Sequence, residues 1–398
     1  MTEYERIART LSEASGLELT AKFLHNFEKE ELKALVAAVE SGGYTERSWY
    51  EITGYSYHVV SDMLDGSINA ANVTDFGNNG RSAVTFAVAG DIVFDPKRPV
   101  MLHAAANGGI MRCIDEKLVD YLNECDIFLL NNEFTISERG EPLADKLWTF
   151  RSDPDNIKIL KKLGVDIVSL ANNHVYDYGE DAFFDTMKYL SEADLPFVGA
   201  GYNVNEAAQA QYFIVNGIKI GVVAASRAEK YYLTPTANFN RAGVLGAYDS
   251  RYLLSAIKMA EEQCDFVVAY IHWGTEYTTE LENEQITLSR EIIDAGADAV
   301  IGGHPHCLQG MEFYNNVPII YSVGNFWFND QTLDSCVATL EIDSELNTKV
   351  LLTPLMQENC ETRLLTEYDE CRRLFDKVES YEPQGVIISD DGVVTPAR

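Results

Sequence analysis

Histidines with amide and carboxylate neighbours are the residues of this sequence best suited to chemistry. His174, His272, His304 and His306 are four of the seven histidines in a chain of 398 residues. Each follows a run of apolar and β-branched residues, which is the pattern of a buried strand. Imidazole, carboxylate and amide groups together suit manganese, iron or zinc, and clustered cysteine is absent. We therefore expect a site for one or two divalent metal ions of the kind that activates water for hydrolysis.

The segment His304-Pro305-His306 is the most specific of these motifs. Residues i and i+2 that leave a strand can both reach one cluster, and the proline stiffens the segment. Taken alone, such a triplet is more often incidental than metal-binding. The preceding Gly302-Gly303 allow a close approach of the backbone and favour a metal site here.

Asn172-Asn173-His174, followed by Asp177, offers an amide ligand, a proton donor and a carboxylate that could orient the imidazole. A helix N-cap and turn would use the same residue types, because Asn and Asp are favoured there. Both interpretations stay open at this motif.

Three further positions are ambiguous when each is taken alone. His272 equally suits a core histidine that bonds to backbone, although the nearby Glu276 favours a lined pocket. Asp91 and Glu133 each follow an apolar run, where a simple turn residue is the more common interpretation. Both interpretations stay open at these three positions.

The elements that must position these residues are six predicted strands. They cover residues 84–89, 127–130, 165–170, 266–271, 299–301 and 319–321. In an open α/β sheet, ligands bind beyond the carboxyl ends of the strands, so the polar residues that follow these runs converge in space. The scattered motifs therefore describe one site.

Helical stretches alternate with these strands and indicate βαβ units and a largely parallel sheet. The stretches are residues 155–163, 180–193, 249–263 and 284–295. Asn216-Gly217 between two apolar runs predicts a hairpin and thus some antiparallel structure.

The chain outside the alternating segment differs in pattern. Residues 18–41 have apolar residues at helical spacing and predict an amphipathic helix, a second helix is expected before residue 72, and residues 72–82 resemble a linker. After residue 333 we expect edge strands and a helix near residues 368–380. The predicted regions are a helical N-terminal region and linker (1–82), an α/β domain with the site (83–333) and C-terminal strands and helix that complete or extend it (334–398).

Composition limits the partners. The net charge of −31, from 31 basic and 62 acidic residues, opposes binding to nucleic acid and to anionic membranes. Seven scattered cysteines form no CxxC pair, no apolar run is long enough to span a bilayer, and the first five residues lack the pattern of a signal peptide. We expect a cytoplasmic protein without a membrane segment that acts on a small-molecule or anionic polymer substrate. The N-terminal region is a candidate for homo-oligomer contacts.

Six ordered motifs resemble the CapA family of bacterial capsule, or poly-γ-glutamate, synthesis proteins, which is similar to the calcineurin-like metallophosphoesterases. The resemblance covers residues 84–328, and its motifs are Gly90-Asp91, Asn132-Glu133, residues 171–179, residues 272–277, Gly303-His304-Pro305-His306 and residues 321–326. It implies a four-layer α/β/β/α sandwich with a metal site at the strand ends. Residues 83–333 would form the metallophosphoesterase-like domain.

The resemblance also implies roles for single residues. The metal ligands would be Asp91, Glu133, Asn173, His272, His304 and His306. His174 would be the general acid, with Asp177 beside it. Asn132, Asn172, Glu276 and Asn325 would contact substrate or support the ligands.

The first motif departs from the phosphoesterase pattern. Those enzymes have a histidine two residues after the aspartate, where this chain has Val93. A single tightly bound ion, or an asymmetric pair, is therefore expected.

The leading hypothesis is a CapA-like, metal-dependent hydrolase in which metal-activated water attacks while His174 protonates the leaving group. One alternative is a non-catalytic protein that binds or scaffolds an anionic polymer through a metal. The other is a cytoplasmic phosphoesterase unrelated to capsule.

Overall fold

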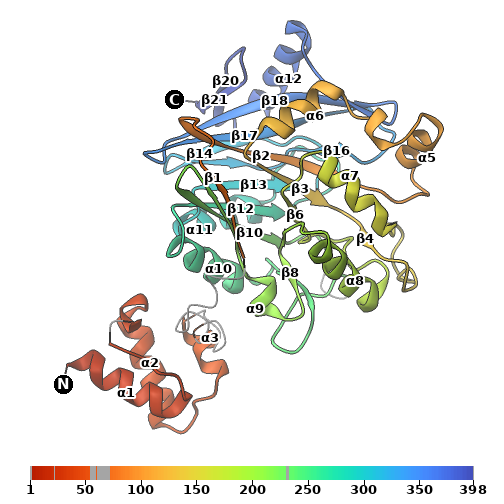
Figure 1. The fold of residues 1–398 in the computed structure, drawn as a ribbon. Helices are drawn as coiled ribbons and strands as arrows, with labels where there is room; N and C mark the ends of the chain where they lie inside the picture. Colours follow the sequence, from red (N-terminus) through yellow and green to blue (C-terminus); the bar gives the residue numbers. More distant parts are fainter. Residues whose placement is uncertain (1, 22, 54–59, 61–71, 230–232, 398) are drawn as a thin grey trace. The chain divides into compact units, whose positions relative to one another are not determined.

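The chain folds into two compact units, Met1–Val73 and Thr74–Arg398. The computed structural model describes residues 2–21, 23–53, 60, 72–229 and 233–397, and Figure 1 shows their elements. The linker expected over residues 72–82 is wrong in part, because β1 (Val73–Gly77) is an edge strand of a sheet in the larger unit.

The N-terminal unit is helical. Its described elements are α1 (Glu3–Ser15), the 3-10 helix η1 (Phe23–Asn26), α2 (Lys29–Glu40) and α3 (Arg47–Thr53). A capping box between Thr2 and Glu5 starts α1, which the sequence analysis did not predict. The helix predicted over residues 18–41 begins only at Lys29, because a second capping box forms there between Glu28 and Glu31. The further helix expected before residue 72 falls mostly outside the described residues.

The first sheet of the larger unit has seven strands in the order β1-β9-β10-β12-β13-β15-β14. After β1, they are β9 (Gln211–Val215), β10 (Ile218–Ser226), β12 (Phe266–His272), β13 (Ala299–Gly303), β14 (Met311–Tyr314) and β15 (Val317–Ile320). The central strands β10, β12, β13 and β15 run parallel. The predicted hairpin at Asn216-Gly217 is confirmed, since β9 and β10 pair antiparallel across it.

The second sheet has ten strands, and its main path is β20-β21-β18-β17-β2-β3-β6-β7. Its strands are β2 (Ala83–Ile92), β3 (Ile127–Asn132), β6 (Ile167–Ser169), β7 (Phe197–Val198), β16 (Asn325–Trp327), β17 (Leu333–Asp343), β18 (Thr348–Glu358), β19 (Glu361–Leu364), β20 (Val386–Ile388) and β21 (Val393–Pro396). All six predicted strands are confirmed, three in each sheet. The expectation that the C-terminal strands lie only at the edge is wrong, because β17 pairs with β2 on one side and β18 on the other.

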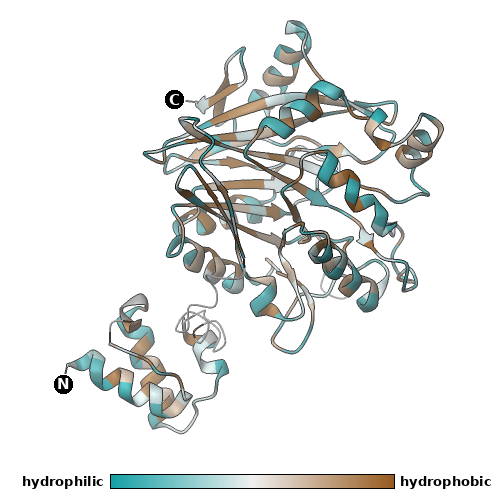
Figure 2. Ribbon diagram, viewed as in Figure 1, coloured by the Kyte–Doolittle hydropathy of each residue, from teal (hydrophilic) through white to brown (hydrophobic). Residues whose placement is uncertain are grey.

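The two sheets pack face to face. Phe86 and Val88 of β2 share one hydrophobic core with Val222 of β10 and Val268 of β12. Figure 2 shows the apolar colour concentrated in these strands. Burying two strongly apolar faces against each other removes them from water and holds the sandwich together.

Helices cover the outer face of each sheet. On the second sheet, side chains of α6 (Glu116–Glu124), α7 (Ile157–Lys162) and α8 (Gly179–Glu192) build a second core with β2 and β3. On the first sheet, α10 (Arg251–Glu261) contacts β10 and β12, and α11 (Asn283–Asp294) contacts β13. The layers are therefore α/β/β/α, as expected, with the sheets at the centre of Figure 1.

The remaining elements are short or peripheral. They are α5 (Pro99–Ala106), η3 (Ile110–Arg112), β4 (Thr135–Ile136), β5 (Arg151–Ser152), η4 (Pro154–Asn156), β8 (Ala200–Gly201), α9 (Val204–Ala207), β11 (Gly243–Val244) and α12 (Tyr368–Ser380). The predicted C-terminal helix is thus confirmed as α12. All seven cysteines are free, and within the described residues no helix has both the length and the apolar character needed to cross a membrane.

Candidate metal centre

The predicted site residues meet where strands of both sheets end. Asp91 lies near the end of β2, Glu133 directly follows β3, and residues 172–174 follow β6. From the other sheet come His272, the last residue of β12, and the loop after β13 that carries His304 and His306. The sandwich thus brings residues from five separate segments of the chain to one edge, by the rule that governs strand ends in α/β folds.

Carboxylates and imidazoles face each other closely at this edge. His306 Nδ1 lies 3.1 Å from Asp91 Oδ2, and His306 Nε2 lies 3.8 Å from Glu133 Oε1. His272 Nε2 lies 3.8 Å from the same Glu133 oxygen and 2.8 Å from Asn173 Oδ1. Glu133 therefore lies between the two groups of ligand candidates.

These atoms fit a metal ion. Three sets have ligand atoms within 4.8 Å of one another, namely Glu133 with His272 and His304, Asp91 with Glu133 and His306, and Glu276 with His304 and His306. Glu133 Oε1 and His304 Nδ1 are buried without a hydrogen-bond partner in the described structure. Unpaired buried acceptors of this kind are costly unless a cation or water satisfies them. The donor set accordingly suits a divalent cation.

The backbone of the histidine loop is strained. His304 has φ of 95° and His306 has φ of 55°, and Tyr277, which follows Glu276, has φ of 57°. Residues other than glycine rarely adopt positive φ, and such conformations cluster at functional sites. Strain at three positions around one cluster is consistent with a site whose geometry is imposed by the fold.

Burial and mutual charge set the protonation of the cluster. Burial and the charge of Asp91 raise the pKa of Glu133 well above its ordinary value, whereas burial lowers the pKa of His272 to about 3 and that of His304 well below its ordinary value. Burial disfavours the charged forms of Asp91 and His306, but the hydrogen bond between them outweighs burial. The pKa of Asp91 is therefore lower than its ordinary value, and the pKa of His306 is higher than its ordinary value. A bound cation would favour the ionised carboxyl and the neutral imidazole at each of these positions.

His174 is oriented by a carboxylate. Its Nδ1 lies 2.6 Å from Asp177 Oδ2, while its Nε2 faces the cluster, 3.9 Å from Glu133 Oε1. Phe150 packs on the imidazole with ring centroids 4.1 Å apart. Burial, with the charge of Lys146, lowers the pKa of His174 despite Asp177. This arrangement fixes the tautomer and points one ring nitrogen into the site.

Four residues predicted near the ligands have distinct places. Asn325 Oδ1 lies 2.9 Å from His306 Nδ1, and Glu276 belongs to one of the three possible ligand sets. Asn172 Oδ1 accepts hydrogen bonds from the backbone N–H of residues 174 and 175 and so shapes the turn, while its Nδ2 donates to Asn131 Oδ1. Asn132 Nδ2 donates to the backbone oxygen of Phe134. Asn172 and Asn132 therefore support the loops.

Sequence reasoning missed two residues that contact the centre. Asn131 Nδ2 donates to Asp91 Oδ1 at 2.7 Å and lies 3.3 Å from both Glu133 Oε2 and His272 Nδ1. Asn131 lies at the end of β3, and this strand-end position could have identified it as a site residue. Lys146, from the loop between β4 and β5, has a side chain only 5% exposed, pairs with Asp177 Oδ1 at 2.9 Å and donates to the backbone oxygen of Asn173. No local pattern marks it.

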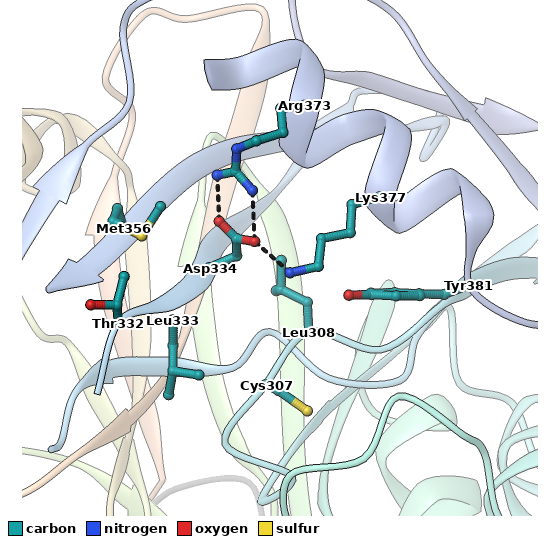
Figure 3. Close-up of a pocket in the computed structure, with 9 residues that line it drawn as sticks. All are labelled: Cys307, Leu308, Thr332, Leu333, Asp334, Met356, Arg373, Lys377 and Tyr381. Atoms are coloured by element: carbon teal, nitrogen blue, oxygen red, sulfur yellow. Dashed lines mark hydrogen bonds and ion pairs between the residues drawn. The ribbon is translucent and has the colours of Figure 1, made fainter. Parts of the chain in front are cut away.

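A separate cavity of about 210 Å³ opens beside Cys307, one residue after His306. Figure 3 shows Asp334 of β17 held by Arg373 and Lys377 of α12 at its wall. The carboxylate is bidentate toward the guanidinium and 2.7 Å from the ammonium group. These contacts fasten α12 to the second sheet.

An α/β/β/α sandwich with histidines and carboxylates at the strand ends defines a protein of the metallophosphoesterase-like class. The model of the family described as bacterial capsule synthesis protein PGA_cap matches residues 85–330, and the chain belongs to this family.

Among relatives, the PGA biosynthesis protein CapA of Bacillus subtilis is 33% identical over 216 residues, which cover 53% of this chain and 56% of that protein. The capsule biosynthesis protein CapA of Bacillus anthracis is 27% identical over 316 residues, covering 77% and 75%. A probable polyglutamine synthesis accessory protein of Mycobacterium tuberculosis is 29% identical over 208 residues, covering 50% and 55%. The chain thus spans little more than half the length of two of these three relatives.

Similar solved structures include a hypothetical protein from Thermus thermophilus, with a TM-score of 0.43 and 16% identity over 69% of this chain and all of that one. A 5'-nucleotidase from Candida albicans has a TM-score of 0.35 and 11% identity, covering 69% of this chain and 53% of that one.

Proposed function

We propose that the chain takes part in the synthesis of a poly-γ-glutamate capsule and acts there as a metal-dependent hydrolase. The capsule role rests on membership of the PGA_cap family and on the printed names of the Bacillus relatives. The hydrolase role rests on the site. The observation that carries it is the placement of His174, with Nδ1 fixed on Asp177 and Nε2 facing Glu133.

The candidate ligands are Asp91, Glu133, Asn173, His272, His304 and His306. A divalent ion bound by them would lower the pKa of a bound water toward about 7 and stabilise negative charge on the substrate. Burial lowers the pKa of His272 and His304, which favours the neutral imidazoles that can bind a cation. Manganese, iron and zinc all suit this donor set.

His174 supplies the proton. In its protonated form, which the charge of Asp177 favours, His174 would keep Nδ1–H on Asp177 and carry a second proton on Nε2 on the side of the cluster, from which it can donate to a departing oxygen or nitrogen. Lys146 and Thr234 Oγ1 both donate to the backbone oxygen of Asn173, which holds the turn that carries His174. The substrate class is a phosphoester or a related acyl or amide bond, in a small molecule or an anionic polymer.

The test compares His174→Ala with the wild type after reconstitution with Mn²⁺. We expect an aryl phosphate or a γ-glutamyl chain to be hydrolysed by the wild type and about 10²-fold to 10⁴-fold more slowly by the variant, with equal metal content. His103→Ala is the matched control, because His103 lies on α5, pairs with Glu361 and should leave both readouts unchanged. Absence of bound transition metal in the reconstituted wild type would refute the proposal.

A second candidate function is a metal-dependent binding protein for an anionic chain. Val93, where the resembled phosphoesterases have a histidine, is fully buried in the core between the second sheet and its helices and offers no ligand. The Asp91 side of the centre therefore keeps Asp91, Glu133 and His306 as possible ligands, without the histidine of the resembled phosphoesterases. Equal metal content with negligible hydrolysis in both wild type and His174→Ala would favour this binder.

A further inference from the structure

The hydroxyl of Tyr270 is buried beneath the metal centre without a hydrogen-bond partner in the described structure. Tyr270 lies in β12, is completely inaccessible to solvent, and its ring belongs to the core between the two sheets. A phenylalanine would fill the same apolar space. An unpaired buried hydroxyl costs free energy, so its presence calls for a partner that the protein chain alone does not supply.

The hydroxyl points toward the carboxylates. Tyr270 and His272 alternate onto the same face of β12, and His272 pairs in register with Gly303 of β13. A Cβ atom placed on Gly303 would lie 2.1 Å from the Tyr270 hydroxyl oxygen and 3.3 Å from Asp91 Oδ1. The phenol therefore occupies the space that Gly303 leaves open, on the side of the centre where Asp91 lies.

On this side the chain has Val93 where the resembled phosphoesterases have a histidine. Val93 offers no polar atom there because its side chain is buried in the other core. A phenol hydroxyl carries its proton at neutral pH and can donate a hydrogen bond. Gly303 and Tyr270 are complementary, since any side chain at position 303 would exclude the hydroxyl.

We infer that Tyr270 is a positioning residue of the metal centre, whose hydroxyl donates a hydrogen bond to the Asp91 side of the centre when a divalent ion and its bound water are present. The inference rests on the proposed metal-dependent function. It adds a residue from the inter-sheet core to a centre otherwise built from strand ends and loops. It also explains why a glycine precedes His304.

The test uses Tyr270→Phe in the full chain, with Mn²⁺ as the probe. In chelator, we expect the variant to melt at a higher temperature than the wild type, because the unpaired hydroxyl is gone. Its affinity for Mn²⁺, measured by titration calorimetry, should be about tenfold weaker, in the range known for residues that orient metal ligands. A higher melting temperature in chelator together with a weaker affinity for Mn²⁺ is the result expected for a hydroxyl that has a partner only when the ion is bound.

The matched control is Tyr321→Phe. The Tyr321 hydroxyl already donates to Glu312 Oε1 at 2.6 Å, so its loss should lower the melting temperature with and without Mn²⁺ and leave Mn²⁺ affinity unchanged. Unchanged Mn²⁺ affinity in Tyr270→Phe would overturn the inference while leaving the proposed metal function intact. A wild type that takes up no Mn²⁺ would overturn both.

Discussion

At the scale of single residues, burial without full hydrogen bonding is what prepares the centre for a cation. Glu133 Oε1 and His304 Nδ1 have no hydrogen-bond partner in the described structure, and Asn131 is shared among Asp91, Glu133 and His272. Such a cluster is unfavourable as a purely structural core, since each unpaired polar atom costs about 1–3 kcal/mol. The free-energy cost of these unpaired atoms to the folded protein is consistent with a cluster that binds a cation.

The buried imidazoles predict how the stability of the metal-free protein depends on pH. Burial depresses the folded-state pKa of His174, His272 and His304, so between that value and the unfolded value near 6.5 the unfolded chain binds more protons. Their contribution is complete above about pH 6.5 and is lost as the pH falls toward the folded values. The raised pKa values of Glu133 and His306 oppose part of this effect.

We expect the free energy of unfolding in chelator to fall by roughly 2 kcal/mol between pH 7.5 and pH 5.5. Urea unfolding at a series of pH values measures it. A free energy that stays flat, or that rises as the pH falls, would contradict the proposed neutral state of the imidazoles.

Some site residues are marked by a short sequence pattern around them and could be predicted, whereas others are not marked in this way and could not. His272, His304 and Asp91 could be predicted because each ends or follows an apolar run that is itself a strand. Lys146 lies 31 positions before Asp177 in a loop without periodicity, so only the folded chain brings the two together. In the sequence, Tyr270 resembles any other core residue of a strand. The strand pattern does not show that its hydroxyl lacks a hydrogen-bond partner within the described residues.

At the scale of elements, strand type was predictable but strand order was not. The period-2 pattern of β17 is visible in the sequence, yet nothing local states that it lies between β2 and β18. Partner choice in an antiparallel sheet depends on side chains distant in sequence. Similarly, α1 escaped prediction because its strongest signal is the short capping box at Thr2 and Glu5.

The ion pairs between α12 and β17 predict how a substitution at their contact changes stability. Asp334 has a side chain only 7% exposed and pairs with both Arg373 and Lys377 of α12. Asp334→Asn should lower the free energy of unfolding by about 1–2 kcal/mol, because two cations then lose a partly buried partner. Figure 3 shows the contacts that would be lost.

The control for this variant is Asp249→Asn. Asp249 pairs with Arg251 through both oxygens, but its side chain is 55% exposed, so its replacement should change stability by less than about 0.5 kcal/mol. Urea unfolding at pH 7 compares the two variants. Equal effects would show that the fastening of α12 contributes little.

At the scale of the whole molecule, both hydrophobic cores of the larger unit are built from residues that follow position 83. The N-terminal unit has buried residues of its own, including Leu11, Leu32 and Trp49. The expected division into an N-terminal helical region and an α/β domain, with C-terminal strands that complete it, remains our proposal for how the chain is organised. So does homo-oligomer contact through the N-terminal region.

This organisation predicts that residues 72–398, which retain all of β1, fold without the N-terminal unit. We expect the truncated protein to keep the metal content of the full chain, with a melting temperature of the α/β domain within a few degrees of it. Calorimetry and elemental analysis measure both, and sedimentation of the two proteins tests the oligomer proposal. Loss of folding on truncation would contradict the division.

The place of β17 also sets an order of events during synthesis. Asp91 of β2 pairs with Asn325 of β16, whereas residues 83–88 of β2 gain their neighbour β17 only when residues 333–343 have been made. Ser335 of β17 then donates to the backbone oxygens of Val323 and Asn325 beside the histidine loop. A nascent chain that ends after Asn325 already contains every candidate ligand, but β2 still has one unpaired edge. We therefore expect the C-terminal strands to leave the ribosome before the candidate centre is complete, so that binding of the proposed metal ion would be a late step in the maturation of this protein.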